Sequence, residues 1–376
     1  MGALGAAGGF LLFVAIGALY SLYGPIIPTL RASFDIGVTA AGLALSAHFA
    51  GAMAGIGGWA LGEARWGSRP SLKTATTLVV AGALGFAVAP AWPLSLAAAA
   101  TLGVGFGALV VGLNRLFATG FGARSAAMLN LLGASFGCGA ITGPLALSLF
   151  DGRFRLIFIA GALLAAVALP LALRAPQIPP SEDAGARMRG RVPARVWGFV
   201  AFYVLYVGVE SGIGGWEATH LLARGASGVA ASNWTAAYWA AITVGRVLAA
   251  PIALRVSPDR LVTGALVLTT LVLGLAHLTA LTAYAYVGAG LALAPVFPTG
   301  LAWLTAALPS ARGATAMVVA GAQLGGVLLP PVIGALVAVA SAEVIPTSLV
   351  LVAAACSLTV FVLLQRHGIP GRTSDA

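Results

Sequence analysis

The sequence predicts an all-α membrane protein with twelve transmembrane helices in two pseudo-symmetric six-helix bundles. Composition is the first observation behind this prediction. Of 376 residues, 60% are hydrophobic and 8% are charged, and the mean hydropathy is +1.00. Soluble domains carry about 25% charged residues. A chain of this length cannot cover a water-exposed surface with so few charges, so most of its surface must face lipid.

The second observation is that apolar segments recur along the whole chain. Each has about 20 residues, the length that a helix needs to cross a bilayer core of about 30 Å. The first segment contains no Lys or Arg between Met1 and Tyr20 and stays apolar to Leu30. We therefore expect a retained span there rather than a cleaved signal peptide. The predicted spans are 8–30, 39–61, 73–91, 94–119, 125–149, 155–173, 196–221, 232–254, 261–281, 284–306, 313–338 and 346–365.

The third observation is a single long polar connection, at 174–195. It contains four prolines and seven charged side chains, a composition typical of a flexible linker. It divides the chain into an N-terminal six-helix bundle, 1–173, and a C-terminal six-helix bundle, 196–376.

The basic residues predict the orientation of these spans. Placing the N-terminus in the cytoplasm puts fourteen Lys and Arg residues inside and only Arg31, Arg153, Arg155 and Arg224 outside. Cytoplasmic loops of membrane proteins carry such an excess. We therefore expect an integral protein of the cell (inner) membrane with both termini cytoplasmic, and we attribute the net charge of +10 to this bias rather than to nucleic-acid binding. The fourteen are Arg65, Arg69, Lys73, Arg124, Arg174, Arg187, Arg189, Arg191, Arg195, Arg255, Arg260, Arg312, Arg366 and Arg372.

Several kinds of chemistry find no support in the sequence. Cys138 and Cys356 both lie inside apolar runs, so neither a disulfide framework nor a metal cluster is indicated. The sequence contains no metal-ligand spacing, no Ser-His-Asp set and no phosphate-binding Gly-Lys-Ser/Thr loop. We therefore expect no metal and no cofactor, and the chain alone is not an ATP-driven pump. A membrane-embedded enzyme would cluster His, Asp or Glu near one interface, and the sequence shows no such cluster.

A weak internal repeat links the two halves. The segment 60–69 follows the second span, and the segment 250–257 follows the eighth span, 190 residues later. Each joins a small-residue helix end to a short basic turn. Both turns resemble the loop signature of the major facilitator superfamily, G-x-x-x-D-R-x-G-R-R. Parallel six-helix repeats are typical of that superfamily.

The match to this signature is partial. In the first copy, Ala60 and Ala64 stand at the Gly and Asp positions, and in the second copy only one basic residue is kept. A Gly-Arg pair in the eighth span also resembles the family. The resemblance implies the major facilitator fold and a role in conformational gating for Arg65, Gly67, Arg69, Arg246 and Arg255.

Longer stretches are similar to the L-fucose permease branch of sugar transporters. These are the segments 103–114, 129–144, 206–216 and 294–299. The resemblance implies a sugar-like substrate. Fucose-type members carry acids in helices 1 and 4, however, whereas helix 1 here has none and Val110 stands at the second position; Gly133 replaces a His of the helix 5 pattern. Fucose specificity and that branch's proton-coupling residues therefore do not carry over.

Glu210 is the candidate for proton coupling, since we place no other carboxylate deep within a span. It lies near the middle of 196–221, and Tyr203, Tyr206 and Glu217 share its helix face. Ionisable groups inside a membrane usually serve function, and a carboxyl group takes up a proton more readily in low-dielectric surroundings. The alternative is a structural carboxylate bound to a hydroxyl group or to Arg246.

Other polar and aromatic residues within spans are candidates for substrate contact, each with a structural alternative. His48 is either a proton relay and hydrogen-bond donor or a neutral core histidine. Amides can recognise hydroxyl groups or join helices, and aromatic rings can line a site or fill the core. Arg246 locks helices together or binds substrate, and we expect Arg115 to reach the interface. The predicted substrate-binding residues are Tyr20, Tyr23, His48, Asn114, Asn130, Tyr206, Glu210, Trp239 and Gln323.

Together these observations predict a monomeric secondary active transporter. It would move a small organic solute, sugar-like and coupled to protons, by alternating access between two bundles. Its partners are the solute, protons and the lipid bilayer, not nucleic acid. One alternative is proton-antiport efflux of an apolar drug or metabolite, which the scarcity of charge within the spans favours. A membrane-embedded enzyme is the alternative from another class.

Overall fold

The structure is a computed structural model that describes residues 1–177, 192–309, 311 and 313–365. Over these residues it is helical, without a β-strand, and twelve helices are long and apolar enough to cross a membrane. The prediction of an all-α membrane protein with twelve spans is confirmed. The helices of the first half are α1 (Ala3–Ser21), α2 (Ile27–Phe34), α3 (Val38–Trp66), α4 (Ser68–Val88), α5 (Trp92–Gly120), α6 (Ser125–Leu149) and α7 (Phe154–Ala172).

The helices of the second half repeat this arrangement of long antiparallel spans. They are α8 (Ala194–Ala223), α9 (Gly228–Ala253), α10 (Pro258–Gly274), α11 (Thr282–Leu293), α12 (Val296–Ala307), α13 (Ala314–Val339) and α14 (Val344–Gln365). Three short 3-10 turns also occur, at Gly122–Arg124, Leu275–His277 and Thr279–Leu281.

Two predicted spans are interrupted helices. The first span breaks between α1 and α2, where Gly24 and Pro25 lie, and the tenth breaks between α11 and α12 at Pro295. Proline has no N–H to donate and its ring clashes with the preceding turn, so a helix ends or kinks there. Both breaks are surrounded by protein, because Ile26 in the first break is fully buried and Ala294 in the second is almost fully buried.

The turn after the second span is shorter than we expected. Helix α3 continues to Trp66 rather than ending at residue 61, and α4 begins at Ser68. Gly67 alone makes the turn, with a φ of +84° that favours glycine. A Cβ atom there would also lie 2.6 Å from the side-chain nitrogen of Gln177. Glu63, which we assigned to this turn, is therefore part of α3.

Glycines let α3 and α5 pack backbone against backbone. A Cβ atom added at Gly51 or Gly55 of α3 would overlap a carbonyl oxygen of α5. In return, a Cβ at Gly103 or Gly107 of α5 would overlap a carbonyl oxygen of α3. Small residues allow such close approach between membrane helices. This reciprocal seam makes the first half rigid along the helices that carry its site residues.

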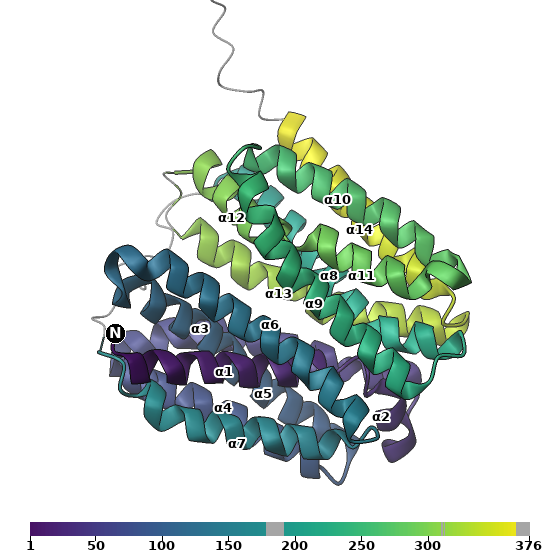
Figure 1. Ribbon diagram of the computed structural model, residues 1–376, viewed down its shortest axis with the longest axis horizontal. Coiled ribbons are helices and arrows are strands. Elements are labelled where there is room, and N and C mark those ends of the chain that lie inside the picture. Colours follow the sequence, from purple (N-terminus) through teal and green to yellow (C-terminus); the bar gives the residue numbers. More distant parts are fainter. Residues whose placement is uncertain (178–191, 310, 312, 366–376) are drawn as a thin grey trace, which may run out of the picture.

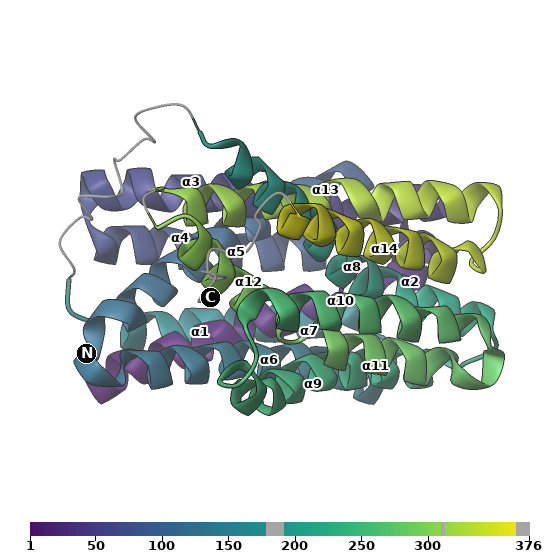
Figure 2. The ribbon, with the colours of Figure 1, turned by 90° about the horizontal axis from the view of Figure 1, so that it is seen from above.

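Figure 1 shows two groups of helices, α1–α7 and α8–α14, and in Figure 2, seen from above, helices of the second group lie over those of the first. The groups meet where α3 lies along α13 and where α6 lies along α9. Our boundaries for the two bundles and the linker, 174–195, stay a prediction, because 178–191 lie outside the described residues. We call one end of the molecule the linker end, because α7 ends there and α8 begins there, and we call the other the opposite end. The N-terminus also lies at the linker end, where the N-terminal nitrogen of Met1 donates to the carbonyl oxygen of Gly120, at 2.5 Å.

The two groups are in contact at the opposite end. The hydroxyl group of Thr39 on α3 donates to the carbonyl oxygen of Gly334 on α13, at 3.1 Å. The indole ring of Trp216 on α8 lies so close that a Cβ added at Gly42 of α3 would be 2.8 Å from it. A Cβ at Gly24 would overlap the carbonyl oxygen of Gly214. These contacts close the opposite end of the interface.

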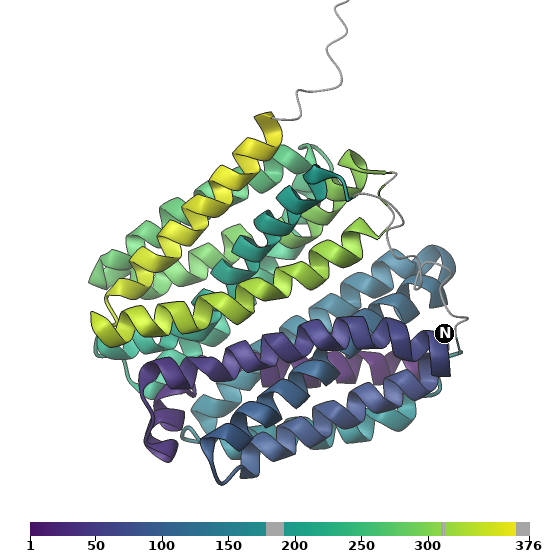
Figure 3. The same cartoon turned by 180° about the vertical axis from the view of Figure 1, so that it is seen from behind.

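Toward the linker end the two groups separate. On α6, a Cβ at Gly137 would overlap the Thr243 side chain of α9, whereas a Cβ at Gly133, one turn nearer the linker end, would meet nothing within 4 Å. Figure 3 shows the same change between α3 and α13, which approach at the end that carries α2 and diverge toward the N-terminus. The interface is thus tightly packed at one end, and at the other the backbones of α3 and α13 diverge.

Candidate functional site

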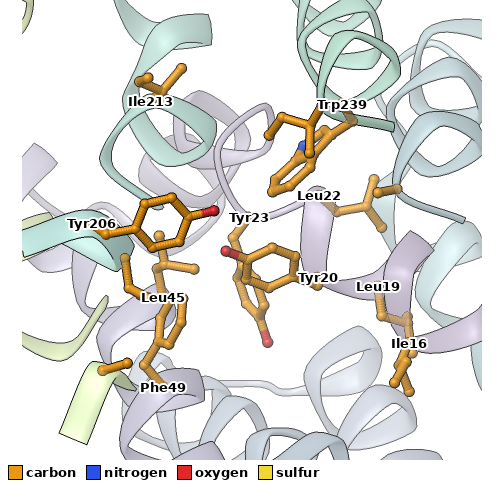
Figure 4. Close-up of a cluster of buried hydrophobic side chains, with 14 of the residues drawn as sticks. Ile16, Leu19, Tyr20, Leu22, Tyr23, Leu45, Phe49, Tyr206, Ile213 and Trp239 are labelled. Carbon is orange, nitrogen blue, oxygen red and sulfur yellow. The ribbon is translucent and has the colours of Figure 1, made fainter. Parts of the chain in front are cut away.

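An aromatic cluster lies where the two groups of helices meet, with Tyr20 of α1 at its centre. Its ring centroid is 5.8 Å from that of Phe49 on α3, 5.7 Å from Phe106 on α5 and 6.1 Å from Phe136 on α6. From the other group, the ring of Trp239 on α9 approaches to 5.4 Å, edge to face. Figure 4 shows Tyr20 between Trp239 and Phe49. Tyr20 and Trp239, both predicted from the sequence, therefore meet across the interface.

His48 is tied to this cluster from the side of α3. It is fully buried, its Nδ1 lies 3.3 Å from the hydroxyl group of Tyr23, and its ring centroid is 4.9 Å from that of Phe106. Its Nε2 is buried with no hydrogen-bond partner among the described residues. The bonded Nδ1 thus fits the alternative of a neutral core histidine, whereas Nε2 remains able to bond a solute or to bind a proton.

Glu210 lies in the wall that α8 contributes to this junction. Its side chain is half-buried, and its main-chain carbonyl oxygen accepts a hydrogen bond from the hydroxyl group of Tyr238, at 3.1 Å. Tyr206 is buried, and its hydroxyl group interacts with the side chain of Glu210. The same hydroxyl group interacts electrostatically with Arg246 of α9. In Figure 4 the hydroxyl group of Tyr206 points toward Tyr20. The structure thus brings Tyr206, Glu210 and Arg246 together near the aromatic cluster.

The predicted amides lie apart from the cluster. Asn114 and Asn130 are exposed in the linker-end halves of α5 and α6, and Gln323 is half-buried on α13. The side-chain nitrogen of Asn114 donates to the carbonyl oxygen of Val110, at 2.7 Å, within its own helix. Gln323 donates likewise to Val319, at 3.4 Å. Within the described part of the chain, no hydrogen bond joins these amides to Tyr20 or Glu210.

The predicted gating residues differ in what they contact. Arg69 donates from Nε to the carbonyl oxygen of Ala175, at 3.3 Å, just beyond the end of α7. Arg65 is exposed, and so is Arg255 in the turn between α9 and α10. Arg246 is half-buried, and its Nε has no hydrogen-bond partner among the described residues. Arg69 is thus the gating candidate that holds two helices together in this conformation.

Arg115 is placed differently from our expectation. It forms an ion pair with Glu63 of α3 rather than extending freely to the interface. The Glu63 side chain is almost fully buried and that of Arg115 is 21% exposed. We missed this pair because we assigned Glu63 to a loop, although its spacing from the last apolar turn of α3 is compatible with a helix.

Glu217 is a second carboxyl group within α8, and it is fully buried. We did not single it out from the sequence, although it shares the helix face of Tyr203, Tyr206 and Glu210 and that spacing was a signal. Its neighbour His220, also fully buried, was missed as well.

Comparison with known proteins decides the family. The sequence model of the Major Facilitator Superfamily matches residues 9–216, more than half of the chain. The chain belongs to the major facilitator superfamily. Its members bind small-molecule substrates in a membrane, so the prediction of an integral membrane transporter is confirmed at this level. No curated protein matches the chain by sequence.

Solved structures of several major facilitator transporters share the fold. The nucleoside transporter NupG is 14% identical, with a TM-score of 0.76, and the match covers 98% of this chain and 100% of NupG. The E. coli xylose transporter XylE, in a partially occluded inward-open conformation, is 13% identical, with a TM-score of 0.78 and coverage of 96% and 99%. The E. coli fucose:proton symporter FucP is 17% identical, with a TM-score of 0.67 and coverage of 96% and 98%. The fucose permease branch that the sequence resembles is thus one of several with this fold.

Proposed function

We propose that this major facilitator protein is a proton-coupled carrier of a small, ring-shaped polar solute, with a sugar as the first candidate. The observation that carries the proposal is the position of Glu210. It is a half-buried carboxyl group that interacts with Tyr206 and Tyr20, near the junction where Tyr20 and Trp239 meet, and Tyr206 also interacts with Arg246. Aromatic faces hold sugar rings by stacking, and a titratable group beside them can link solute binding to proton binding.

The closed and open ends of the interface support transport by alternating access. A solute would reach the aromatic cluster from the linker end in this conformation, while Thr39, Gly42 and Trp216 close the opposite end. Rocking of one half against the other would reverse the two ends. The carrier would work as a monomer, because each chain holds both halves and the junction between them.

The basic residues support an orientation with the linker end in the cytoplasm of the cell (inner) membrane. Apart from Arg115 and Arg246, which lie further inside their helices, the described chain carries eight basic residues at the linker end and four at the opposite end, an excess that fits the positive-inside rule. The eight are Arg65, Arg69, Lys73, Arg124, Arg174, Arg195, Arg255 and Arg260, and the four are Arg31, Arg153, Arg155 and Arg224.

A second candidate function is proton-coupled efflux of an apolar compound. The observation that favours it is the apolar character of the cluster, where Phe49, Phe106 and Phe136 surround Tyr20. The amides that would recognise sugar hydroxyls lie away from these rings. Both candidates use Glu210 for the proton, and they differ in the solute and in the direction of movement.

The test uses purified protein in proteoliposomes. A thermal-shift screen of D-xylose, L-fucose, uridine and ethidium selects the solute, and transport of the labelled solute is then measured with and without an imposed proton gradient. We expect Glu210→Gln, which keeps the shape but cannot titrate, to abolish gradient-driven accumulation while counterflow exchange persists. Asp35→Asn, which changes an exposed carboxylate at the opposite end, is the matched control and should transport like the wild type.

Three outcomes would contradict the proposal. Accumulation driven by protons in Glu210→Gln would exclude this residue as the coupling group and leave His48. Loss of folded protein in the variant would favour the structural alternative for Glu210. Binding of ethidium without any of the three polar solutes would favour the efflux candidate over the sugar.

A further inference from the structure

Glu217 is held unlike any other acid in the described chain. Its side chain is fully buried, and neither carboxyl oxygen has a hydrogen-bond partner within bonding distance. The side chain of Thr235 on α9 faces it, but that hydroxyl group donates to the carbonyl oxygen of Ala231, at 3.2 Å. An ionised carboxylate without partners is costly in such surroundings, so the group is stable there only when it carries a proton. Such a group is a functional candidate inside a membrane protein.

Two tyrosines from neighbouring helices interact electrostatically with Glu217. Tyr238 of α9 interacts in this way with both Glu217 and Glu210, and its hydroxyl group donates to the main chain of Glu210. Tyr286 of α11 interacts with Glu217. Both rings are buried. Tyr238 is therefore a group that both carboxyl groups of α8 share, and Tyr286 links Glu217 to α11.

From Tyr286 a chain of titratable groups continues to water. The hydroxyl group of Tyr286 is 2.7 Å from Nδ1 of His220, which is fully buried. The other ring nitrogen of His220, Nε2, is 3.7 Å from a carboxyl oxygen of Glu343. Glu343 lies in the connection between α13 and α14 at the opposite end, and its side chain is 53% exposed. Arg224 also faces this carboxylate and binds it through two guanidinium nitrogens.

We propose that Glu217 is a second proton-binding site of the carrier, loaded from the opposite end through Glu343, His220 and Tyr286, and connected to Glu210 by Tyr238. This inference rests on the proposed role of Glu210 in coupling. In the loading step His220 binds a proton at Nε2 and releases the Nδ1 proton to the oxygen of Tyr286. A rotation of the Glu217 side chain then brings its carboxylate, which has no hydrogen-bond partner among the described residues in this conformation, to Tyr286, and Tyr286 passes its own hydroxyl proton to it. One proton has then moved inward, and both His220 and Tyr286 are neutral again.

The chain of groups lies apart from the closed solute route. Trp216, the residue before Glu217, packs against Gly42 of α3 and Gly334 of α13, in the contact between the two halves. Glu217 faces α9 and α11 instead, inside the second half. Protons can therefore reach Glu217 from the opposite end while the solute route at that end stays closed. The second half alone would carry the proton, and the first half would supply most of the aromatic rings.

The test compares variants in proteoliposomes under an inward proton gradient, with the solute that the screen above selects. We expect Glu217→Gln to lower the rate of gradient-driven uptake about a hundredfold or more, the scale on which positioned proton donors act, with counterflow unchanged. Tyr286→Phe removes the hydroxyl group that bonds His220 and should slow gradient-driven uptake, again without effect on counterflow. Tyr284→Phe, a change on the same helix at a residue that is 64% exposed, is the matched control and should behave as the wild type.

The variants separate a failure of this inference from a failure of the proposed function. If the wild type shows no proton coupling, or if Glu210→Gln keeps it, the proposed function fails. If Glu210→Gln is uncoupled but Glu217→Gln accumulates solute like the wild type, only the inference about Glu217 is overturned. Equal loss of accumulation and counterflow in Glu217→Gln would also overturn it, because a purely structural role has that effect.

Infrared spectroscopy decides the case if Glu217→Gln does not fold. A protonated carboxyl group without a hydrogen bond gives a separate carbonyl band, which should disappear as the wild type is titrated upward in pH. In Glu217→Asp, which keeps the titratable group, this band should shift. A wild type without a titrating band of this kind, or a band unchanged in Glu217→Asp, would overturn the inference.

Discussion

The two halves of the molecule treat their interior ionisable side chains differently. In the first half, Glu63 pairs with Arg115, and His48 has a hydroxyl partner in Tyr23. In the second half, Glu210 has no ion pair among the described residues and Glu217 has no hydrogen-bond partner. Unpaired buried groups cost stability, whereas paired ones are compensated. The buried acid of the first half is thus compensated by an ion pair, whereas the two acids of α8 in the second half have no such partner among the described residues.

The seams between helices differ in how their glycines are distributed. The first half joins α3 and α5 through glycines on both helices, with main-chain oxygens as the opposing atoms. In the second half, a Cβ atom at Gly325 of α13 would overlap the carbonyl oxygen of Val204 on α8, whereas a Cβ at Gly208 of α8 would meet the side chain of Leu329. Main-chain contact is thus reciprocal in the first half and one-sided in the second.

The largest effect should come from adding one methyl group to the seam of the first half. In Gly55→Ala the new Cβ atom would overlap the carbonyl oxygen of Val104, so we expect a loss of about 3 kcal/mol or more in unfolding free energy. Gly57→Ala, two residues on, is the matched control, because a Cβ there meets nothing within 4 Å. It should be neutral or slightly stabilising, as alanine favours helix. Thermal unfolding in detergent measures both, and equal stability of the two variants would refute the rigid seam.

The next effect tests whether pairing stabilises the first half. Glu63→Gln removes the carboxylate that pairs with Arg115, and we expect a loss of about 2 kcal/mol in unfolding free energy. This is less than for a fully buried pair, because Arg115 is partly exposed and keeps other contacts. The same change at Glu217, where no partner is lost, should leave stability unchanged or raise it. A larger loss for Glu217→Gln than for Glu63→Gln would reverse our comparison.

A smaller effect on stability should distinguish Arg69 from Arg65, two basic residues near the turn at Gly67. Arg69→Ala removes the hydrogen bond to the carbonyl oxygen of Ala175 and should cost about 1 kcal/mol. Arg65→Ala changes an exposed side chain and should leave stability unchanged in this conformation. Both variants should lower the transport rate more than solute affinity if they act in gating. Unfolding curves and initial transport rates would show whether the two residues differ in this way.

The smallest effect concerns Glu343 at the opposite end of the second half. Hydrogen bonds from the Arg224 guanidinium hold the pKa of this carboxyl group below its usual range. Because this pKa is lowered by folding, the ion pair stabilises the folded state at pH values above the ordinary carboxyl pKa of about 4.3. The stabilisation is lost as the pH falls through the lower pKa that the group has in the folded state. Because the side chain is half exposed, we expect Glu343→Gln to cost only about 0.5 kcal/mol at pH 7. The difference from the wild type should vanish in acid, and a difference that grows there would contradict this sign.

Most of the fold could be predicted from the sequence, because each span must be apolar over about 20 residues. The interruptions beside Pro25 and Pro295 were less predictable, since prolines also occur inside continuous helices here, as Pro144 does in α6. The turn at Gly67 was placed too early because charged residues of α3 extend beyond its apolar stretch. Hydropathy alone does not show where a helix ends in water.

The site was predictable only in part. Tyr20, Trp239, Tyr206 and Glu210 share a location because each lies near the middle of its span, which a sequence shows. Which helix faces which is a property of packing, so the sequence could not place Glu217 beside Tyr238 and Tyr286. For the same reason it could not show that Asn114 lies outside the aromatic cluster.

The closed contact at the opposite end is made by uncharged groups. A hydroxyl-to-carbonyl hydrogen bond from Thr39 and the indole ring of Trp216 against Gly42 join the two halves there, and among the residues that the structure describes no ion pair runs from one half to the other. Dissolved salt screens interactions between charges but not van der Waals contacts or buried hydrogen bonds. The contact that closes this end should therefore hardly weaken as ionic strength rises, and the conformation described here should persist in dilute and in saline solution alike.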